Sequence, residues 1–377
     1  MDTSVFFKIM LAVMPVKPGL RSYGDLHWII LIMKFLILSK DMNFSVTGGQ
    51  KVNKRIYDIL SHKGHEVTFC QQLHPTNGNW QYLISLIIHV SEYLKYDKII
   101  IDSSSFPKTL WFVLIAGLFG KREKITTTLH HYIYESVGGI KGIVYKLLET
   151  TFVKQCGTVI IFSPYIIDLS KELIPISRIR YVGLPFEKGV HFNKNKKNGQ
   201  LLFVGTIDER KGLKYLVEAI ALMPADVRCN VVLNVVGKVV SESYYNDICT
   251  MIKNNDIEKN IVFKGRVSDE ELKNLFDESM IFTFPSLLEG FGMVIIEAMA
   301  KGLPVVAFDN SAMPYTIKTG VNGIITKNKN AQSLCDAIVE ILSDHDYYVR
   351  LAEGARKTYE QSKSYEEFDS DIITLFS

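Results

Sequence analysis

The sequence predicts an α/β protein of two doubly wound domains, each a parallel β-sheet covered by helices. The first observation is an alternation of short apolar runs with segments of helical period, which begins at residue 34. The second is that this alternation stops near residues 183–197 and then restarts. The third is the length of 377 residues, which fits two domains. Two consecutive series of alternating strands and helices predict two parallel sheets.

In the first half, short apolar runs bounded by polar residues or glycine predict buried strands. The segments between them have helical period, and Gly64 follows the first, as expected for a residue that ends helices. We expect the helix at 109–120 to be buried, because it is almost entirely apolar. The expected strands are 34–39, 65–69, 98–101, 125–129 and 158–162, and the expected helices are 52–63, 82–94 and 109–120.

The second half repeats this alternation. The expected strands are 201–204, 230–236, 261–263, 281–284 and 304–308, and the expected helices are 213–222, 244–253, 270–276, 294–300 and 331–342. Ligands of doubly wound sheets bind beyond the carboxyl ends of the strands. We therefore expect the following loops to line one cleft between the domains: 48–50, 130–131, 205–211, 265–267 and 286–293.

These observations divide the chain into four parts. Residues 34–183 form the N-terminal domain, 184–355 the C-terminal domain, and 356–377 a helix that we expect to pack back on the N-terminal domain. Residues 1–33 show neither a tidy leader-peptide cleavage site nor a strand–helix alternation. We interpret them as an upstream extension; a membrane-associating arm is the alternative.

Charge is distributed unevenly between the two halves. Residues 1–190 contain 22 Lys and Arg against 14 Asp and Glu, whereas residues 191–377 contain 21 against 26. A basic half suggests an anionic partner, such as a lipid surface or a phosphorylated acceptor, although an ordinary solvated surface is the alternative. Nucleic acid is disfavoured, because the sequence has no dense Lys/Arg stripe and no recognisable reader motif.

Five scattered cysteines without a Cys-x-x-Cys pair argue against a disulfide scaffold or a structural zinc site and indicate a reducing cytosol. The apolar stretch at 110–120 falls far short of the ~20 residues that span a bilayer. We therefore expect a cytoplasmic protein, peripheral at the inner face of the membrane if the basic half binds lipid.

The strongest chemical signal is the string PSLLEGFGMVIIEAMA at residues 285–300. A strand is expected to end at residue 284 and a helix to begin at 291–293, so that free N–H groups at the helix start can bind a phosphate or a sugar oxygen. Glu289 stands at this helix start, and Glu297 lies eight residues further on, about 12 Å along a helix. Two acids so far apart predict contacts with different parts of an elongated ligand. Taken alone, the two acids are better interpreted as a helix cap and a solvated residue.

The second signal is FVGTIDERKG at residues 203–212. A strand, a turn at Gly205 and the cations Arg210 and Lys211 at a helix start predict a diphosphate clamp. An exposed basic pair is the alternative. Fixed cations there stabilise the negative charge that builds up on a departing diphosphate, by ~3 kcal/mol per well-placed donor.

Weaker signals lie elsewhere. Gly49 follows the first strand, and His130 ends the strand at 125–129, although a Gly-Gly pair or a lone His is more often structural. The end of the strand near Arg266 and Val267 is a further candidate, for which a plain strand end is the alternative. Two Asp-x-Asp triplets, at 344–346 and 369–371, fall in helical segments, and we interpret them as solvated or capping residues rather than a metal site.

Taken together, the string P-S-x-x-E-G-F-G-x-x-x-x-E-A-M-A-x-G-x-P-V-V-A resembles the E-x7-E element of the retaining family 4 glycosyltransferases, which are group 1 enzymes of the GT-B fold. The resemblance extends from residue 34 to about 360 and is closer in the second half. It implies two Rossmann-like domains facing across a cleft. It also implies transfer of a hexose from a UDP- or GDP-linked donor to a saccharide or lipid-linked acceptor, with retention of configuration, in cell-envelope polysaccharide or glycolipid synthesis.

The resemblance also implies roles for individual residues. Glu289, Arg210, Lys211 and His130 would be catalytic: Glu289 and His130 would face the donor sugar, and the two cations would stabilise the diphosphate without a metal or other cofactor. Glu297 would bind the ribose. The residues assigned to substrate binding are Gly49, Gly205, Arg266, Val267, Gly290, Phe291, Gly292, Met293, Val294 and Glu297.

The sequence also departs from the family pattern. Thr206 stands where the family usually has an arginine, and Arg210 fits a variant with an arginine directly before the lysine. Leu184–Glu187 and Pro314–Tyr315 also differ from the usual residues. Two other functions stay open at this point: a nucleotide-sugar epimerase on the same scaffold, and a non-catalytic relative that binds nucleotide sugar.

Overall fold

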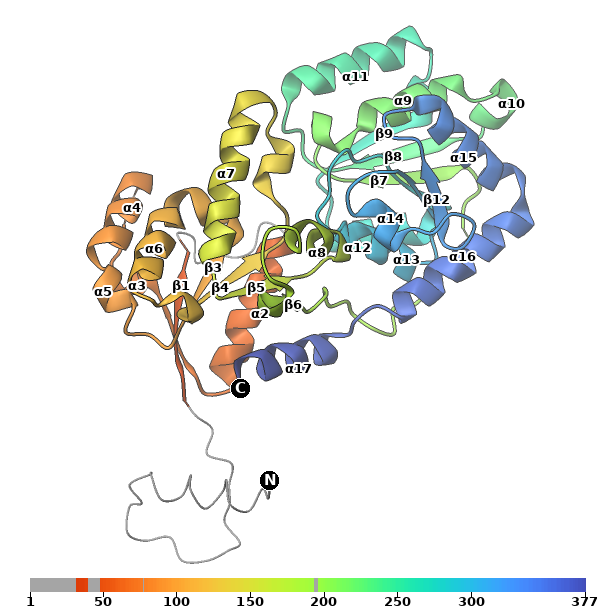
Figure 1. Ribbon diagram of the computed structural model, residues 1–377. Helices are drawn as coiled ribbons and strands as arrows, with labels where there is room; N and C mark the ends of the chain where they lie inside the picture. Colours follow the sequence, from red (N-terminus) through yellow and green to blue (C-terminus); the bar gives the residue numbers. More distant parts are fainter. Residues whose placement is uncertain (1–31, 40–47, 77, 193–195) are drawn as a thin grey trace, which may run out of the picture. The chain divides into compact units, whose positions relative to one another are not determined.

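The computed structural model describes residues 32–39, 48–76, 78–192 and 196–377. The expected N-terminal extension, apart from residues 32 and 33, lies outside the described residues, as does the segment 40–47 before Gly48. The described chain contains two six-stranded sheets in which neighbouring strands run parallel, with helices on both faces of each sheet (Figure 1). This architecture confirms the predicted fold class of two Rossmann-like domains.

The first sheet has the strand order β2-β1-β3-β4-β5-β6. Its inner strands are almost completely buried on both faces, as expected for a parallel sheet covered by helices, and their buried residues are apolar except for the three threonines of β4. The strands are β1 Lys34–Leu38, β2 Glu66–Phe69, β3 Lys98–Asp102, β4 Ile125–Leu129, β5 Thr158–Ile161 and β6 Ile179–Tyr181.

Helix α2 packs on one face of the first sheet, whereas α4, α6 and α7 pack on the other. The helices of this half are α2 Gly48–His62, α3 Cys70–Leu73, α4 Asn79–Ile88, α5 Val90–Tyr93, α6 Phe106–Leu118, α7 Gly139–Gln155 and α8 Pro164–Ser170. Short 3-10 turns lie between them: η1 Ser103–Ser105, η2 Arg122–Lys124, η3 Ile133–Ser136 and η4 Ile176–Arg178.

Two expectations for these helices need correction. The segment 82–94 is not one helix, because the chain turns at His89 between α4 and α5. The helix predicted at 109–120 begins earlier, at Phe106, and is not buried throughout: Trp111 and Leu118 are exposed. An apolar side chain on a covering helix is buried only where it faces the sheet, which the composition of the helix does not reveal. None of the described helices combines the length and the apolar content needed to cross a membrane.

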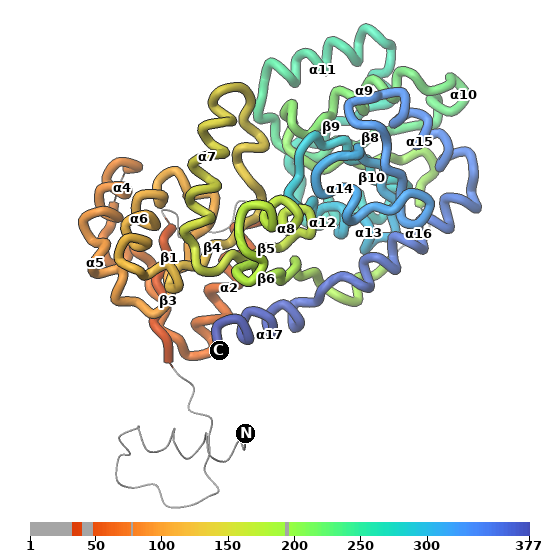
Figure 2. Tube along the Cα trace, viewed as in Figure 1, coloured from red at the N-terminus to blue at the C-terminus, as the bar shows by residue number. Residues whose placement is uncertain are grey.

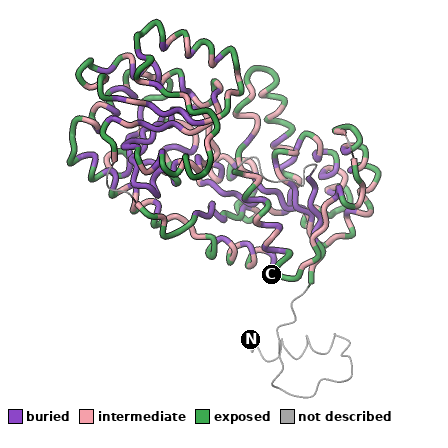
Figure 3. Tube along the Cα trace, turned by 180° about the vertical axis from the view of Figure 1, so that it is seen from behind, coloured by how far each residue is buried: buried purple, intermediate pink, exposed green. Residues whose placement is uncertain are grey.

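The second sheet has the order β12-β11-β10-β7-β8-β9. Its strands are β7 Gln200–Val204, β8 Val232–Val236, β9 Ile261–Gly265, β10 Ile281–Phe284, β11 Val305–Phe308 and β12 Gly323–Thr326. The helices and turns are η5 Glu209–Lys211, α9 Leu213–Leu222, α10 Ala225–Arg228, α11 Glu242–Asn254, η6 Glu258–Asn260, α12 Asp269–Glu278, α13 Met293–Ala300, α14 Met313–Thr316, α15 Ala331–Ser343 and α16 His345–Glu360. Figure 2 traces the same chain as a tube coloured along the sequence, and Figure 3, coloured by burial, shows the strands largely buried and exposed residues on the outer sides of the covering helices.

The chain ends in helix α17, Tyr365–Phe376, which lies against α2 of the first half (Figure 1). Arg55 of α2 forms a two-pronged ion pair with Asp369, with both N···O distances 2.8 Å, and its guanidinium lies 4.3 Å from the centre of the Tyr365 ring. Phe376 packs edge-on against Phe35 of β1. Asp369 is therefore an ion-pair partner, not merely a solvated or capping residue, whereas Asp344 caps α16.

Candidate functional site

A cavity of about 560 Å³ lies beyond the carboxyl ends of the two sheets, with walls from both halves of the chain. Four of the five predicted loops contribute to it, and the loop at 265–267 does not. The first half supplies Gly48, Gly49, His130, His131, Ser136, Phe162 and Leu184. The second half supplies Val204, Gly205, Thr206, Arg210, Lys211, Phe284 and the run from Leu288 to Val294.

The Glu289 carboxylate is the centre of charge in this cavity. Its Oε1 accepts a hydrogen bond from Arg210 (3.0 Å), one from Lys211, and one from the Ser286 hydroxyl (2.8 Å). The side chains of Glu289 and Lys211 are each only 12% exposed, whereas that of Arg210 is 42% exposed. One carboxylate thus faces two cations, which leaves a net positive charge for an anionic ligand.

Hydrogen bonds from the neighbouring loop after β11 hold Glu289 in place. The Glu289 backbone N–H donates to the Ser311 hydroxyl (3.0 Å), and the Glu289 carbonyl accepts from the N–H of Ala312. Asn310 donates to the Ser286 carbonyl, which fixes the start of the same loop. Adjacent parallel strands β10 and β11 end side by side, so their loops can brace each other.

Arg210 and Lys211 are presented by the short turn η5 after β7. Asp208 caps this turn by accepting from the Lys211 N–H, and Thr206 donates to the Asp208 carboxylate (2.6 Å). The Lys211 ammonium lies 4.8 Å from the centre of the Phe284 ring. Thr206 therefore supports the capping residue of this turn, and the cations that the turn presents to the cavity are Arg210 and Lys211.

Helix α13 begins at this cavity. Gly292 precedes it with a left-handed backbone (φ 80°), and the first-turn N–H groups of a helix have no partner within the helix. Met293 and Val294 line the cavity, which places the positive end of the helix dipole beside the two cations. The arrangement suits a bound anion.

His130 lies on the opposite wall of the cavity, between the Phe162 ring and the backbone of Gly49. Its ring stacks on Phe162, with centroids 4.7 Å apart and planes 14° apart, and Gly49 covers the other face. A Cβ at Gly49 would lie 3.2 Å from the ring carbons, so a side chain there would crowd the imidazole. Burial lowers the pKa of His130, which favours the neutral ring.

A buried chain of hydrogen bonds orients this histidine. Asn53 donates from its amide nitrogen to the Asp102 carboxylate (2.6 Å), and its amide oxygen faces His130 Nε2 at 3.2 Å. Because a carboxylate only accepts, Asp102 sets the orientation of the amide, and this assigns the imidazole proton to Nε2. Nδ1 of the neutral ring is then an acceptor.

The two walls approach each other closely at Gly290. A Cβ at this position would lie 2.3 Å from the His130 carbonyl oxygen and 3.1 Å from the His131 Cβ, so any side chain would push the halves apart. Desolvation and Arg210 lower the pKa of His131 at this contact, while Glu289 raises it. The cavity geometry therefore depends on a glycine from the E-G-F-G string.

Three predicted site residues lie away from the cavity. Glu297 is exposed on α13 and lines a separate hollow with Glu187 and Lys301. Desolvation raises the pKa of the Glu297 carboxyl group, and the positive charge of Lys51 acts in the opposite direction. Arg266 is exposed, and Val267 is half-buried against the main core. The remaining eleven predicted site residues line the cavity.

Asn53, Asp102, Ser286 and Ser311 belong to the site but were not among the sequence-predicted residues. Asp102 ends the central strand β3, and the neighbouring strand β4 ends just before His130. A polar residue at the end of this strand could therefore have predicted a side chain near His130. Asn53 gave no such signal, because it lies within an otherwise ordinary helical period.

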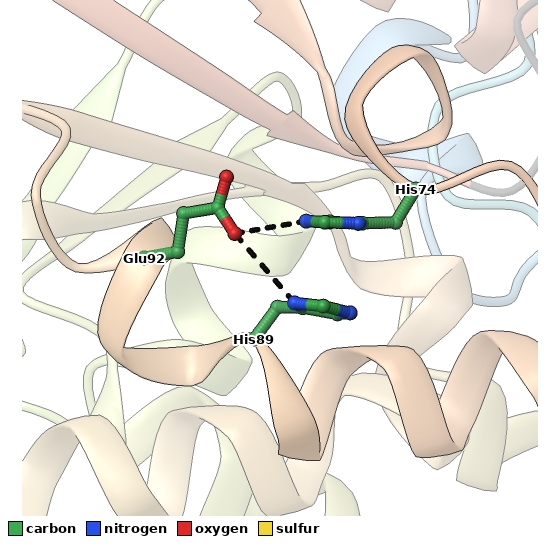
Figure 4. Close-up of side chains that lie close together, drawn as sticks. All are labelled: His74, His89 and Glu92. Atoms are coloured by element: carbon green, nitrogen blue, oxygen red, sulfur yellow. Dashed lines mark hydrogen bonds and ion pairs between the residues drawn. The ribbon is translucent and has the colours of Figure 1, made fainter.

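A group of possible metal ligands lies elsewhere, on α3–α5 (Figure 4). His74 Nε2 and His89 Nδ1 both face Glu92, at 2.9 and 3.6 Å. The two imidazole rings stack with centroids 3.4 Å apart and planes 10° apart. A metal lies near the plane of each ligating ring, and two parallel rings stacked in this way cannot share one. The group is therefore best described as a cluster of two stacked imidazoles beside the Glu92 carboxylate.

Comparison with known sequences links the chain to glycosyltransferases. The family model for group 1 glycosyl transferases matches residues 187–358. An uncharacterized protein of the cps region of Klebsiella pneumoniae is 30% identical over 288 residues, which cover 72% of this chain and 76% of that protein. An uncharacterized glycosyltransferase of Methanocaldococcus jannaschii is 28% identical over 52% of this chain and 50% of the relative. The O-antigen chain mannosyltransferase B of Escherichia coli is 29% identical over 47% and 45%. The chain thus spans about half of the length of these last two relatives.

Comparison with solved structures supports the fold. The HepE protein of Anabaena in complex with UDP and glucose superimposes with a TM-score of 0.69 and 18% identity, covering 91% of this chain and 99% of that one. At this identity the likeness shows the fold alone.

Proposed function

We propose, from the premise that the chain belongs to the group 1 glycosyltransferases of the GT-B fold, that it transfers a hexose from a nucleotide-diphosphate sugar to an acceptor with retention of configuration. The observation that carries this proposal is the grouping of Glu289, Arg210 and Lys211 at the start of α13, inside a cavity between the two sheets. A site with two cations, one acid and a helix start is suited to a diphosphate bonded to a sugar.

In this proposal, the donor diphosphate replaces the carboxylate as the partner of the cations. Arg210 and Lys211 donate to its oxygens, and the N–H groups of Gly292, Met293 and Val294 lie within the same cavity wall. Negative charge grows on the diphosphate as the bond to the sugar breaks, so these donors stabilise the transition state more than the ground state. Glu289, released from the cations, accepts from the sugar hydroxyls.

Retention is proposed through attack on the face from which the diphosphate departs. The Glu289 carboxylate already accepts from Ser286 and is held by its backbone, so it is better placed to bind hydroxyl groups than to become a covalent nucleophile. His130, with Nδ1 assigned as an acceptor, is proposed to face the donor sugar. Glu297 is proposed to bind the ribose, and Arg266 and Val267 to border the base. Because all three lie outside the cavity, these roles require the bound nucleotide to extend beyond it.

The donor is proposed to be UDP- or GDP-linked, and the HepE complex with UDP and glucose supports the uridine form for this fold. The acceptor is proposed to be a saccharide or lipid-linked saccharide of the cell envelope, assembled at the cytoplasmic side. The O-antigen chain mannosyltransferase supports this acceptor class.

We further propose that transfer needs no metal, because Arg210 and Lys211 supply the positive charge. Chelation with EDTA is then expected to change the transfer rate less than about twofold. Loss of activity on chelation, restored by Mg²⁺ or Mn²⁺, would contradict this part of the proposal.

The function is tested in two stages. A thermal-shift panel of UDP, GDP, their monophosphates and their hexose conjugates is expected to show stabilisation by one diphosphate and its sugar, through mass action. NMR of the product formed from the stabilising donor is then expected to show the anomeric configuration of that donor. No stabilisation by any diphosphate, or an inverted product, would overturn the proposal; interconversion of nucleotide sugars without release of nucleotide would indicate an epimerase.

A further inference from the structure

A separate pocket of about 420 Å³ lies where the chain crosses between its two halves. The chain crosses twice: residues 182–186 run from β6 toward the second half, and residues 361–364 run from α16 to α17. The two crossings are joined, because the Phe186 N–H donates to the Lys363 carbonyl (2.9 Å). Both crossings line the pocket, which we call the hinge pocket.

Both halves of the chain form the rim of the hinge pocket. Pro164, at the start of α8, belongs to the first half, and Tyr315 of α14 belongs to the second. The Tyr315 hydroxyl donates to the Asp168 carboxylate of α8, and the ring centres of Tyr315 and Tyr165 are 6.0 Å apart. A ligand in this pocket would therefore contact both halves and both of the segments that connect them.

The hinge pocket shares a wall with the cavity of the candidate site. Leu184 and Phe291 line both spaces. Phe291 stacks on Phe186 of the first crossing, with ring centroids 6.0 Å apart and planes 26° apart. In the sequence it stands between Gly290 and Gly292, which line the cavity. A ligand in the hinge pocket would thus pack against a ring that also bounds the proposed diphosphate site.

The charged side chains of the hinge pocket already have partners. Lys363 forms an ion pair with Asp371, and Glu367 accepts a hydrogen bond from the Ser364 N–H (2.7 Å) at the start of α17. Among the described residues that line the pocket, no charge is left without a partner. The hinge pocket therefore suits a neutral ligand, in contrast to the cavity with its two cations.

Neutral polar groups and aromatic rings remain for such a ligand. The hydroxyls of Tyr181 and Thr316 and the amide of Gln361 come from three segments, and none of them forms a hydrogen bond within the part of the chain that the structure describes. The rings of Phe186 and Phe291 also line the pocket. A saccharide ring matches this lining, because its C–H faces pack on aromatic rings while the hydroxyls around its edge both donate and accept.

We propose that the hinge pocket binds a neutral saccharide, and that its occupancy strengthens nucleotide binding in the neighbouring cavity. A saccharide bonded to both crossings and to α14 stabilises the arrangement of the two halves that forms the cavity. A nucleoside diphosphate that binds the same arrangement is then bound more tightly, and the effect is reciprocal. Saccharide binding does not rest on the proposed function, whereas its coupling to the nucleotide does.

Saturation-transfer NMR of the full chain tests the binding. The probes are glucose, galactose, mannose, N-acetylglucosamine and maltotetraose, and we expect transfer to at least one of them. Transfer to a monosaccharide indicates a free sugar as the ligand, whereas transfer to maltotetraose alone indicates part of a longer saccharide chain.

Two variants locate the bound saccharide. Thr316→Phe places a ring in the hinge pocket and is expected to reduce transfer at least about tenfold. Gln361→Leu removes an exposed amide of similar size and is expected to weaken binding about threefold. Thr250→Phe, at an exposed threonine of α11, is the matched control and should behave like the unchanged protein. Circular dichroism shows whether each variant is folded.

Calorimetry tests the coupling. The Kd of UDP or GDP is expected to fall about fivefold at saturating saccharide, and to stay constant in Thr316→Phe. The inference is overturned by a lack of binding of all five probes, by equal transfer to Thr316→Phe, which would place the sugar elsewhere, or by an unchanged Kd. If neither UDP nor GDP binds, the proposed function fails together with the coupling, while the NMR experiment still decides whether the hinge pocket binds a saccharide.

Discussion

The two halves of the chain share one architecture but differ in what they expose. The second half places an acid and two cations at its strand ends, and its sequence matches a family model from residue 187 to 358. The first half places a stacked histidine there and exposes apolar side chains of α7, such as Ile140 and Ile143. Recognisable sequence thus lies where the proposed donor diphosphate binds, a group that such enzymes share, and fades in the half that is proposed to bind the acceptor.

At the cavity, the two halves approach each other at glycines. Gly290 of the second half lies against the His130 carbonyl, and Gly48 lies so close to the Met293 sulfur that a Cβ there would be 2.8 Å from it. Side chains in these positions would widen the cavity. In the cavity, the second half supplies the charged groups, whereas the first half supplies the packing that shapes the opposite wall. Four substitutions test this division.

The largest effect is expected for Lys211→Ala. Lys211 is 12% exposed and paired with Glu289, so its loss removes a fixed cation at the proposed diphosphate site. We expect kcat to fall about 100- to 1000-fold. Lys214→Ala, an exposed lysine three residues further on, is the matched control and should leave steady-state rates unchanged. Equal rates for the two variants would show that the positive charge of Lys211 does not contribute to transfer.

Glu289→Gln separates binding from turnover. Glu289 neutralises part of the positive charge of Arg210 and Lys211, so the amide should tighten binding of free nucleoside diphosphate about tenfold while kcat falls. Calorimetry of UDP or GDP binding beside initial rates measures both quantities. Weaker diphosphate binding by this variant would show that Glu289 positions the cations rather than competing with the ligand.

Asn53→Ala tests the contribution of the first half. The substitution leaves Asp102 and His130 without their shared buried partner, so the unfolding free energy should fall by about 1–3 kcal/mol. We expect kcat to fall about tenfold, with a shift in its pH profile because the His130 tautomer is no longer held. Lys54→Ala, on an exposed neighbour in α2, is the control. A stability loss with an unchanged pH profile would limit Asn53 to a structural role.

The smallest effect is expected for Glu149→Gln, which alters the hydrogen bonds between α7 and η3 and the pH dependence of stability. Burial raises the pKa of Glu149 to about 7, against 4.5 for an ordinary glutamate. Between these values the folded state binds more protons than the unfolded state, so this carboxyl makes stability fall as pH rises from 4.5 to 7. The difference in Tm between the protein and the variant should change by about 2–4 °C across this range.

Thermal unfolding in matched buffers on both sides of this range measures the change. Glu123→Gln, at an exposed site of the same half, serves as the control and should leave the pH dependence as it is. A Glu149→Gln curve parallel to that of the unchanged protein at every pH would show that the carboxyl does not titrate on unfolding.

Much of the fold could be predicted because parallel strands buried on both faces are short apolar runs. β10 at 281–284 and α9 at 213–222 were predicted with their observed bounds. Helix α7 was not predicted, because it turns its apolar stripe outward and buries an acid. In the site, Glu289, Arg210, Lys211 and His130 were found from strand ends and helix starts, whereas Asn53 required the spatial neighbours of α2.

The amino-acid order alone determined the two sheets, the loops that end them and the acid and cations those loops carry, because each depends on a local pattern of a few residues. The tertiary structure decided which of these groups meet. It paired Glu289 with Arg210 and Lys211 across about eighty positions of sequence, and it oriented His130 through Asn53 and Asp102. It also decided which side of α7 faces outward. Contacts between distant segments depend on how the sheets and helices pack, and no local pattern in the chain encodes that packing.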